Sequence, residues 1–375
     1  MPSTNAMSFK TECEKNAISA SVPLLRSIKL KILRKSLSVL LFLLNVHLGY
    51  TQEYFVHPFE GSDTNNGTIE NPVRSIEEAI TRANRLTGEG AITINLMPGT
   101  YVLQDKLIIN PVRMLNDSNP LTIKAYHMPD DEDWAPELMP TIQSISKNNS
   151  STFFEHSVGF LIASNNVVFK GIRFLGNSNP QVKYYYPITK ENKALKRLSV
   201  LQCMFIGDKE SAKIQGGIWV HGPNTVIDHS IFYECRNAIL LFDNVAGFRI
   251  SNSIIYKSYE SAFWLGPEDM EFEFYNNILL SNSNLLVGRS ADLKYSSPFR
   301  ESIISDNDTN GKVGYWSREK GTIVPITNPN IKMINITNDN SLGIVENEEA
   351  VLPKRHLHVT NWTVDREEPG IFINQ

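Results

Sequence analysis

Residues 217–284 repeat one pattern three times: GIWVHGPNTVIDHSIFYECRN (217–237), AILLFDNVAGFRISNSIIYKSYES (238–261) and AFWLGPEDMEFEFYNNILLSNSN (262–284). Ser230 and Ser253 are 23 residues apart, and Ser253 and Asn277 are 24 apart. Each copy holds three short apolar runs between polar turn residues, and their Ile, Val, Phe and Tyr favour strands over a helix. Because so short a unit cannot bury its own apolar face, it must stack on copies of itself. The stretch therefore predicts a solenoid of three parallel sheets.

Alignment of the copies separates the inside of each coil from the outside, since successive side chains of a strand point to opposite faces. The inward columns are Ile218, Ile239 and Phe263; Val220, Leu241 and Leu265; and Ile227, Ile250 and Phe274. The outward column of the first strand is Trp219, Leu240 and Trp264. His229, Asn252 and Asn276 share a position in the turn before the third strand. An Asn ladder there would bind backbone groups that the bend leaves unpaired.

This repeat resembles the right-handed parallel β-helix of the pectin lyase-like superfamily. Two earlier segments are similar to the first coils of such proteins: YFVHPFEGSDTNNGTIENPVRSIEEAITRA (54–83) and ITINLMPGTYVLQDKLIIN (92–110). In the first of them, Ser75 and Glu78 make a capping box before an apolar stripe, which predicts a helix over the open end of the first coil. The expected fold is all-β, a single-stranded right-handed parallel β-helix with an N-terminal capping helix.

The N-terminus carries a second kind of signal. Lys29, Lys31, Arg34 and Lys35 precede a short, mostly apolar run at 37–44. This order is typical of a secretory signal peptide, and the run is short for a membrane span; an N-terminal anchor or a buried strand is the alternative. We therefore expect a signal peptide and leader at 1–51, no membrane span in the mature chain, and a protein that is secreted, periplasmic or at the cell surface.

The rest of the chain, 52–375, is predicted to be one β-helix domain. A side loop at 178–197 is expected to interrupt the coils. Its tyrosines at 184–186 and its basic residues, Lys190 among them, either bind a ligand or pack as an ordinary solvated loop. Residues 285–375 are predicted to form closing coils and a C-terminal cap.

The net charge limits the kinds of ligand that the protein can bind, and the cysteine positions predict the state of the thiols. Without the seven Lys and Arg and two Glu of residues 1–51, the 36 basic and 40 acidic residues become 29 and 38, a net charge of −9. Such a protein is a poor nucleic-acid binder and would hold an acidic glycan only through a local basic patch or a bound cation. Cys203 and Cys235 occupy different columns of the repeat, which predicts two buried thiols. The acidic stretch 130–140 makes calcium possible, although an exposed loop is its commoner meaning.

The resemblance implies a polysaccharide ligand, because superfamily members that act on polysaccharides are mainly lyases and hydrolases. A lyase needs a group that neutralises the uronate carboxylate and a base beside the acidic C–H, whereas a hydrolase needs paired carboxylates. Neither set is present here as a recognisable motif. The leading hypothesis is a secreted carbohydrate-active protein, possibly a polysaccharide lyase cleaving acidic glycans by β-elimination. The alternative is a noncatalytic glycan-binding or cell-surface structural protein.

A polar ridge at the third turns is the candidate catalytic site. Glu234, Lys257 and Ser281 form one column, with Arg236, Tyr259 and Glu260 beside it. In the lyase hypothesis Lys257 is the base, Arg236 binds the substrate carboxylate and Tyr259 is the acid. The alternative is a surface ladder of salt bridges contributing roughly 0–1 kcal/mol.

Candidate substrate-binding residues flank this ridge: Trp219, Trp264, His221, Glu234 and Glu260. The two indoles would stack on sugar rings if exposed. The alternative is that the C-terminal segment or the side loop covers them. His221, Asp228 and His229 lack the spacing of a metal motif, so no metal ligand is predicted.

Overall fold

The computed structural model describes residues 51–266, 272–291, 299–305, 313–327, 329, 331–337, 342–344, 359–360, 362 and 366–373. The chain divides into two units, Met1–Gly49 and Tyr50–Gln375. The first unit, with most of the predicted signal peptide and leader, lies outside the described residues. No helix in the described ranges is long and apolar enough to cross a membrane.

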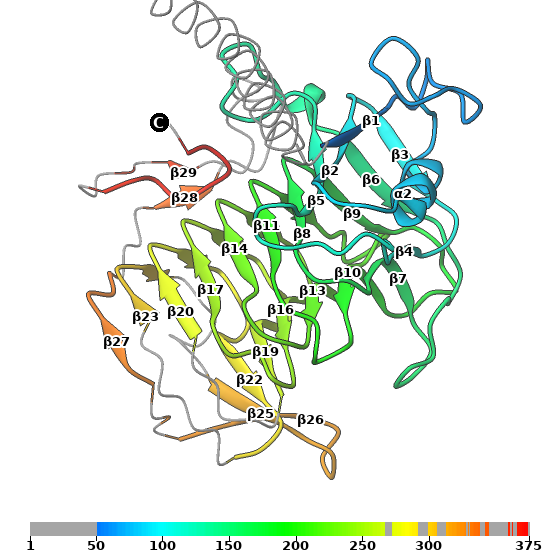
Figure 1. Ribbon diagram of the computed structural model, residues 1–375. Helices are drawn as coiled ribbons and strands as arrows, with labels where there is room; N and C mark the ends of the chain where they lie inside the picture. The colour runs from blue at the N-terminus through cyan, green and yellow to red at the C-terminus, as the bar shows by residue number, and fades with distance from the viewer. Residues whose placement is uncertain are drawn as a thin grey trace, which may run out of the picture. The chain divides into compact units, whose positions relative to one another are not determined.

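Three sheets dominate the second unit (Figure 1). The ten-stranded sheet holds β1 (Gln52–Val56), β2 (Ile92–Leu96), β5 (Leu121–Ala125), β8 (Val167–Lys170), β11 (Leu198–Leu201), β14 (Val226–Asp228), β17 (Phe248–Ser251), β20 (Phe272–Tyr275), β23 (Phe299–Arg300) and β27 (Met333–Ile334). The eight-stranded sheet holds β3 (Thr100–Leu103), β6 (Thr141–Ser144), β9 (Arg173–Asn177), β12 (Met204–Ile206), β15 (Ile231–Tyr233), β18 (Ile254–Tyr256), β21 (Ile278–Leu280) and β24 (Ile303–Ser305).

The nine-stranded sheet holds β4 (Leu107–Ile109), β7 (Ser157–Ile162), β10 (Tyr185–Lys190), β13 (Gly216–Val220), β16 (Asn237–Leu241), β19 (Ser261–Leu265), β22 (Leu286–Gly288), β25 (Val313–Ser317) and β26 (Thr322–Pro325). Outside the three sheets are the helix α2 (Ile76–Arg85), the 3₁₀ turn η1 (Pro136–Leu138) and a strand pair, β28 (Gly343–Ile344) with β29 (Val359–Thr360).

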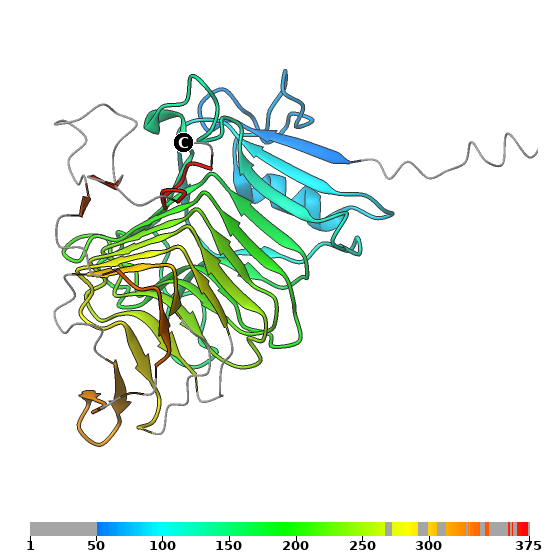
Figure 2. The ribbon, with the colours of Figure 1, turned by 90° about the vertical axis from the view of Figure 1, so that its left-hand side faces the viewer.

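Each coil passes from the ten-stranded to the eight-stranded to the nine-stranded sheet, and then starts the next coil beside itself (Figure 2). Within the three sheets the described pairings are parallel except for β25 with β26. Ile218 pairs with Ile239 and Ile239 with Phe263, and Ile227, Ile250 and Phe274 align likewise. The predicted parallel β-helix and its inward columns are confirmed.

The predicted side loop at 178–197 is wrong. Residues Tyr185–Lys190 form β10, which pairs with β7 and β13 and is buried along its whole length. Lys190 is not part of a solvated basic patch, because its side chain has 0% exposure and its ammonium donates to Thr225 Oγ1 at 3.3 Å. The segment is therefore an ordinary coil whose strand was hidden by its Tyr, Pro, Thr and Lys content.

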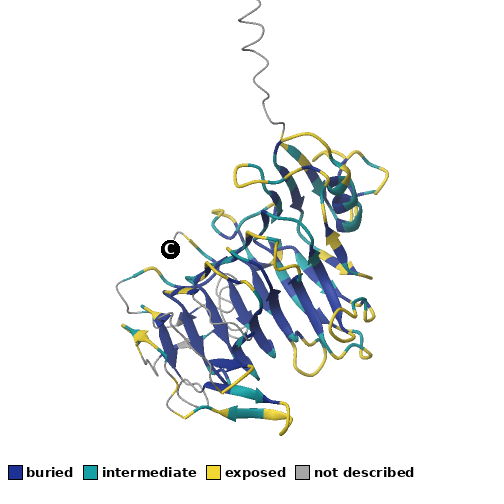
Figure 3. Ribbon diagram, turned by 60° about the horizontal axis from the view of Figure 1, so that its bottom comes forward, coloured by how far each residue is buried: buried dark blue, intermediate teal, exposed yellow. Residues whose placement is uncertain are grey.

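The strands of the coils are largely buried (Figure 3), and their inward side chains form one continuous apolar core. Aromatic rings of successive coils stack within it. Phe205 and Phe232 lie parallel, with centroids 4.7 Å apart. A second apolar layer lies on the outer face of the eight-stranded sheet, where Trp134, Ile254 and Ile371 belong to one buried cluster. That outer face is thus closed by the 131–139 segment and by C-terminal residues.

Helix α2 begins after Ser75, as the sequence predicts. Ser75 Oγ accepts the backbone N–H of Glu78 at 3.1 Å, but the backbone N–H of Ser75 donates to Asp63 instead of Glu78. Glu78 instead accepts from Arg82 at 2.7 Å. The buried stripe of α2 is Ile76, Ala79, Ile80 and Ala83. It packs nearest to β1, β2 and β4, the first strands of two sheets.

The turn between the ten-stranded and eight-stranded sheets carries two polar columns. His229, Asn252 and Asn276 adopt left-handed backbone angles, with φ of 47°, 49° and 50°, and Asn276 Nδ2 donates to Asn252 Oδ1 at 2.8 Å. The next residues, Ser230, Ser253 and Asn277, are fully buried or nearly so, and each side chain accepts the backbone N–H of the preceding coil. The inner ladder that satisfies the bend thus lies one residue after the predicted column.

Cys203 and Cys235 are free, buried thiols, as predicted. Burial raises the pKa of the Cys203 thiol to about 12 and that of Cys235 further still. Both therefore behave as small apolar core residues.

Candidate functional site

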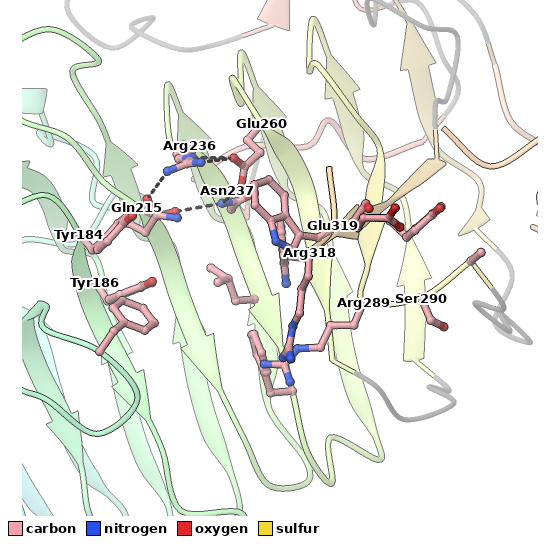
Figure 4. Close-up of a pocket in the computed structure, with 18 residues that line it drawn as sticks. Tyr184, Tyr186, Gln215, Arg236, Asn237, Glu260, Arg289, Ser290, Arg318 and Glu319 are labelled. Atoms are coloured by element: carbon pink, nitrogen blue, oxygen red, sulfur yellow. Dashed lines mark hydrogen bonds and ion pairs between the residues drawn. The ribbon is translucent and has the colours of Figure 1, made fainter. Parts of the chain in front are cut away.

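An open groove of about 970 Å³ crosses the outer face of the nine-stranded sheet (Figure 4). Its walls come from coil after coil, from β10 to β25. The 18 lining residues are Phe154, Tyr184, Tyr186, Gln215, Arg236, Asn237, Leu240, Phe242, Glu260, Trp264, Arg289, Ser290, Ala291, Tyr315, Trp316, Ser317, Arg318 and Glu319. The lining comes from strands that are neighbours in the nine-stranded sheet, so the groove follows the stacking direction of the coils. Each step from one coil to the next is ~4.8 Å.

Aromatic side chains make up much of the groove surface. Seven of the 18 lining residues are aromatic, a share well above the 10% of the whole chain. Trp264 is half-buried on β19, and its ring lies 6.1 Å from that of Trp316 on β25. Because β-strand side chains alternate between faces, Trp264 stands outside while its neighbours Phe263 and Leu265 fill the core.

One wall carries a connected polar group. Arg236, which precedes β16, donates from Nε to Glu260 Oε2 at 2.6 Å and from Nη1 to Gln215 Oε1 at 3.2 Å. Asn237 Nδ2 donates to the other Glu260 oxygen at 2.9 Å (Figure 4). Gln215, Arg236 and Glu260 come from the same turn of three successive coils. The stacking of the repeats therefore builds this wall.

The other charged residues of the groove are Arg289, Arg318 and Glu319, all exposed. The Arg289 guanidinium lies over the Phe242 ring, 4.8 Å from its centroid. No carboxylate of the described residues makes an ion pair with Arg289 or Arg318. The described lining holds three arginines and two glutamates, Glu260 and Glu319, so the groove carries one net positive charge in an acidic protein.

Some residues of the predicted polar ridge line the groove, and others lie outside it. Arg236 and Glu260 line the groove, whereas Glu234, Lys257 and Tyr259 are not among its lining residues. The Lys257 ammonium lies over the ring of Tyr256, 5.2 Å from its centroid. Glu234 and Lys257 do share a column, because both occupy the left-handed position after strands of the eight-stranded sheet, with φ of 49° and 55°. Burial raises the pKa of Tyr259 to about 12.

The predicted aromatic strip is open at one end and covered at the other. Trp264 lines the groove, but Trp219 is only 3% exposed. The cover is residues 145–156, the segment between β6 and β7, which we call the covering segment. The rings of Phe153 and Phe154 lie 5.5 and 6.3 Å from the Trp219 ring. Tyr186 of the predicted side loop also packs on the Trp219 ring, with centroids 4.8 Å apart, and Trp316 of the predicted C-terminal segment packs on Trp264, so both expected covers contribute.

His221 is covered as well. Phe153 stacks on its ring at 6.1 Å, and Nδ1 lies 3.4 Å from Asp243. Burial lowers the pKa of His221, with Asp243 opposing the shift. The covering segment was not predicted from the sequence. The feature that could have indicated it is the adjacent pair Phe153 and Phe154 in a polar stretch.

Metal ligation has no support at the acidic stretch. Asp130 accepts from Gln202 Nε2 and from the backbone N–H of Ile373, both at 2.8 Å. Within the described ranges no three His, Cys, Asp or Glu side chains gather as a metal site would require.

No protein-family model and no curated protein matches this sequence. Solved structures to which it is similar include a rhamnogalacturonan lyase, with 14% identity, coverage of 68% of this chain and 69% of that chain, and a TM-score of 0.46. A pectate lyase has 17% identity, coverage of 78% of each chain and a TM-score of 0.39. The pectin methylesterase of Aspergillus niger has 13% identity, coverage of 85% of this chain and 94% of that chain, and a TM-score of 0.45. At these identities and scores the likenesses say nothing about the chemistry of this chain.

Proposed function

We propose that the groove binds an extended polysaccharide chain whose sugar rings stack on its aromatic side chains. The observation that carries the proposal is the pairing of seven aromatic residues with a connected polar wall in one groove. Sugar rings present apolar C–H faces to aromatic rings and hydroxyl groups to polar side chains, so they need both kinds of surface. Phe154 is exposed, and Tyr184, Trp264, Tyr315 and Trp316 are partly exposed, so these rings are open to a ligand.

The direction of the groove supports a chain-like ligand. Its lining spans the coils of β10, β13, β16, β19, β22 and β25. The ~4.8 Å step between coils is close to the length of one pyranose unit, so each coil meets about one sugar. Arg289 and Arg318, unpaired among the described carboxylates, favour a glycan that carries acidic groups.

Binding without catalysis is the function that the geometry supports best. The Arg236 guanidinium is held by Glu260 at 2.6 Å, so a substrate carboxylate would have to displace an internal one. Lys257 and Tyr259 do not line the groove. The presence of Arg236 in the groove wall nevertheless supports a second candidate, β-elimination with Lys257 as base and Tyr259 as acid. A phenol with a pKa of about 12 stays protonated at neutral pH, which suits an acid.

Two structural roles complete the proposal. We infer that α2 closes the first coil, since its buried stripe packs beside β1, β2 and β4. We also infer that the coils are right-handed and that the protein acts outside the cytoplasm, as the predicted signal peptide implies.

Affinity measurements test the binding proposal. Purified protein is titrated with pectate, alginate, chondroitin, heparin and neutral xylan. Trp264→Ala should weaken binding of the preferred glycan roughly tenfold, because it removes a stacking ring. The matched control is Tyr275→Ala, which removes an aromatic ring that is 48% exposed on the ten-stranded sheet. Equal affinity for wild type and Trp264→Ala would contradict the proposal.

Ultraviolet absorbance of the unsaturated uronate product separates the two candidates. Binding without any absorbance rise, with and without calcium, leaves a binding protein. A rise that Lys257→Ala abolishes would establish elimination and make Lys257 the base.

A further inference from the structure

We propose that the covering segment closes a second part of the same groove, a subsite for one neutral, hydroxyl-bearing sugar unit. This inference rests on the proposed function, and it concerns residues that do not line the open groove. The residues that would hold the sugar are Trp219 and Thr189, which pair in register, with His156, Glu191 and His221.

The floor of the open groove continues beneath the covering segment. Trp264 pairs in register with Leu240, Leu240 with Trp219, and Trp219 with Thr189. All four stand on the outer face of the nine-stranded sheet. Only the part from Trp219 onward is covered by Phe153 and Phe154. A glycan lying along the coils and stacked on Trp264 therefore points at the covered part.

The covered part holds buried polar atoms without hydrogen-bond partners. They are Thr189 Oγ1, Glu191 Oε1, His156 Nε2, Trp219 Nε1 and His221 Nε2. Their residues are neighbours: the His156 and Trp219 rings are 5.5 Å apart, those of Trp219 and His221 are 6.0 Å apart, and His156 Nε2 lies 3.9 Å from Glu191 Oε1. Buried polar atoms are nearly always hydrogen-bonded, so these five atoms call for ordered water or a ligand that can replace it.

The donor and acceptor pattern indicates hydroxyl groups. Trp219 Nε1 is a donor. His221 Nδ1 lies 3.3 Å from the backbone N of Asp243 and 3.4 Å from its carboxylate, so His221 Nε2 donates in one tautomer and accepts in the other. His156 Nδ1 lies 2.7 Å from the carbonyl of Phe154, which leaves Nε2 as an acceptor. Thr189 can do either. Glu191 is an acceptor, and its carboxylate lies 3.9 Å from His156 Nε2, so a uronate carboxylate would be repelled here.

The cover is held lightly at its tip. Residues 151–155 are exposed, and one side-chain hydrogen bond, Thr152 Oγ1 to Glu191 Oε2 at 2.8 Å, joins them to the sheet. The base is firmer, since Ser150 and His156 exchange backbone hydrogen bonds. Lifting the tip breaks one hydrogen bond and four ring contacts, those of Phe153 and Phe154 with Trp219, His221 and Tyr184, and leaves the base in place.

Trp219→Phe is the sharpest test, because it keeps one aromatic ring and removes the indole N–H donor. The probes are xylohexaose and cellohexaose, with hexagalacturonate for comparison, measured by calorimetry. Trp219→Phe should weaken binding of the neutral hexasaccharides about three- to tenfold, the size expected for one hydrogen bond. The matched control, Trp134→Phe, removes a buried indole N–H in the cluster on the outer face of the eight-stranded sheet, away from the groove, and should leave affinity unchanged.

A second arm tests the cover itself. Phe153→Ala should speed association of the neutral hexasaccharides several-fold, whereas Phe59→Ala, a 69% exposed side chain on another segment, should not. Phe154 is left unchanged because it also lines the open groove. Near-ultraviolet circular dichroism verifies that each variant is folded.

The outcomes separate this inference from the proposed function. Unchanged affinity in folded Trp219→Phe would overturn the covered subsite and leave the open groove. Binding of hexagalacturonate without any binding of neutral hexasaccharides would do the same. If no glycan of either panel binds, the covered subsite and the proposed polysaccharide-binding function are both overturned.

Discussion

Trp219 and Trp264 occupy the same position two coils apart, yet they lie in different environments. Both stand on the outer face of the nine-stranded sheet with Leu240 between them. Trp264 lines the open groove, whereas Trp219 is covered by Phe153 and Phe154. The difference arises 65 or so residues earlier in the chain, in a segment outside the repeat. Side chains at equivalent repeat positions therefore point in the same direction but differ in solvent exposure.

Truncation of the covered indole should have the largest effect. We expect Trp219→Ala to lower the free energy of unfolding by about 3–5 kcal/mol, because it opens a cavity among Phe153, Phe154 and Tyr186. Denaturant titration measures it. A cost below about 1 kcal/mol would mean that the covering segment does not pack on the sheet in solution.

The buried Lys190, on the inner face of the covered coils, should give a pH-dependent effect. Its pKa is lowered by burial to about 8, from 10.5. The unfolded chain therefore binds the proton more tightly, so stability should rise as pH increases from about 8 to 10.5. Below pH 8 the full penalty applies, on the order of 3 kcal/mol.

Lys190→Met removes that penalty. The variant should be more stable than wild type at pH 7, and the difference should shrink toward pH 10.5. Lys147→Met, at an exposed position, is the control. A stability difference that does not depend on pH would contradict a buried, titrating Lys190.

The polar wall of the open groove should give an intermediate effect. Glu260→Gln weakens the contact with Arg236 and the bond from Asn237, so we expect a loss of stability of about 1–2 kcal/mol. It also frees the Arg236 guanidinium, which should strengthen binding of acidic glycans. If affinity for pectate and alginate falls instead, Glu260 itself contacts the sugar.

Truncation of the open indole should have the smallest effect on stability. Trp264 is half-buried and packs on Trp316, so Trp264→Ala should cost no more than about 1 kcal/mol. Comparison with Trp219→Ala under the same denaturant conditions measures the contrast directly. Similar losses for both indoles would show that the open groove is covered in solution.

Much of the fold follows from local patterns. The alternation of Ile218, Trp219 and Val220 places the outer indole and the two core residues, and Ser75 marks the start of α2. The strand at Tyr185–Lys190 escaped prediction because a fully buried strand need not alternate, and its Pro and Lys imitate a loop. The candidate site was half visible: Arg236, Glu260 and Trp264 line the groove, but Arg289, Arg318 and Trp316 lie beyond the clear repeats.

The sequence by itself determined the solenoid, because a 23- or 24-residue unit with three short strands can bury its apolar face only against its own copies. It also determined which side chains face outward, since that depends on the two-residue period of a strand. Only the tertiary structure decided which outward side chains remain open. Exposure depends on segments such as 145–156 that fold across several coils, and no local period encodes where such a segment lands.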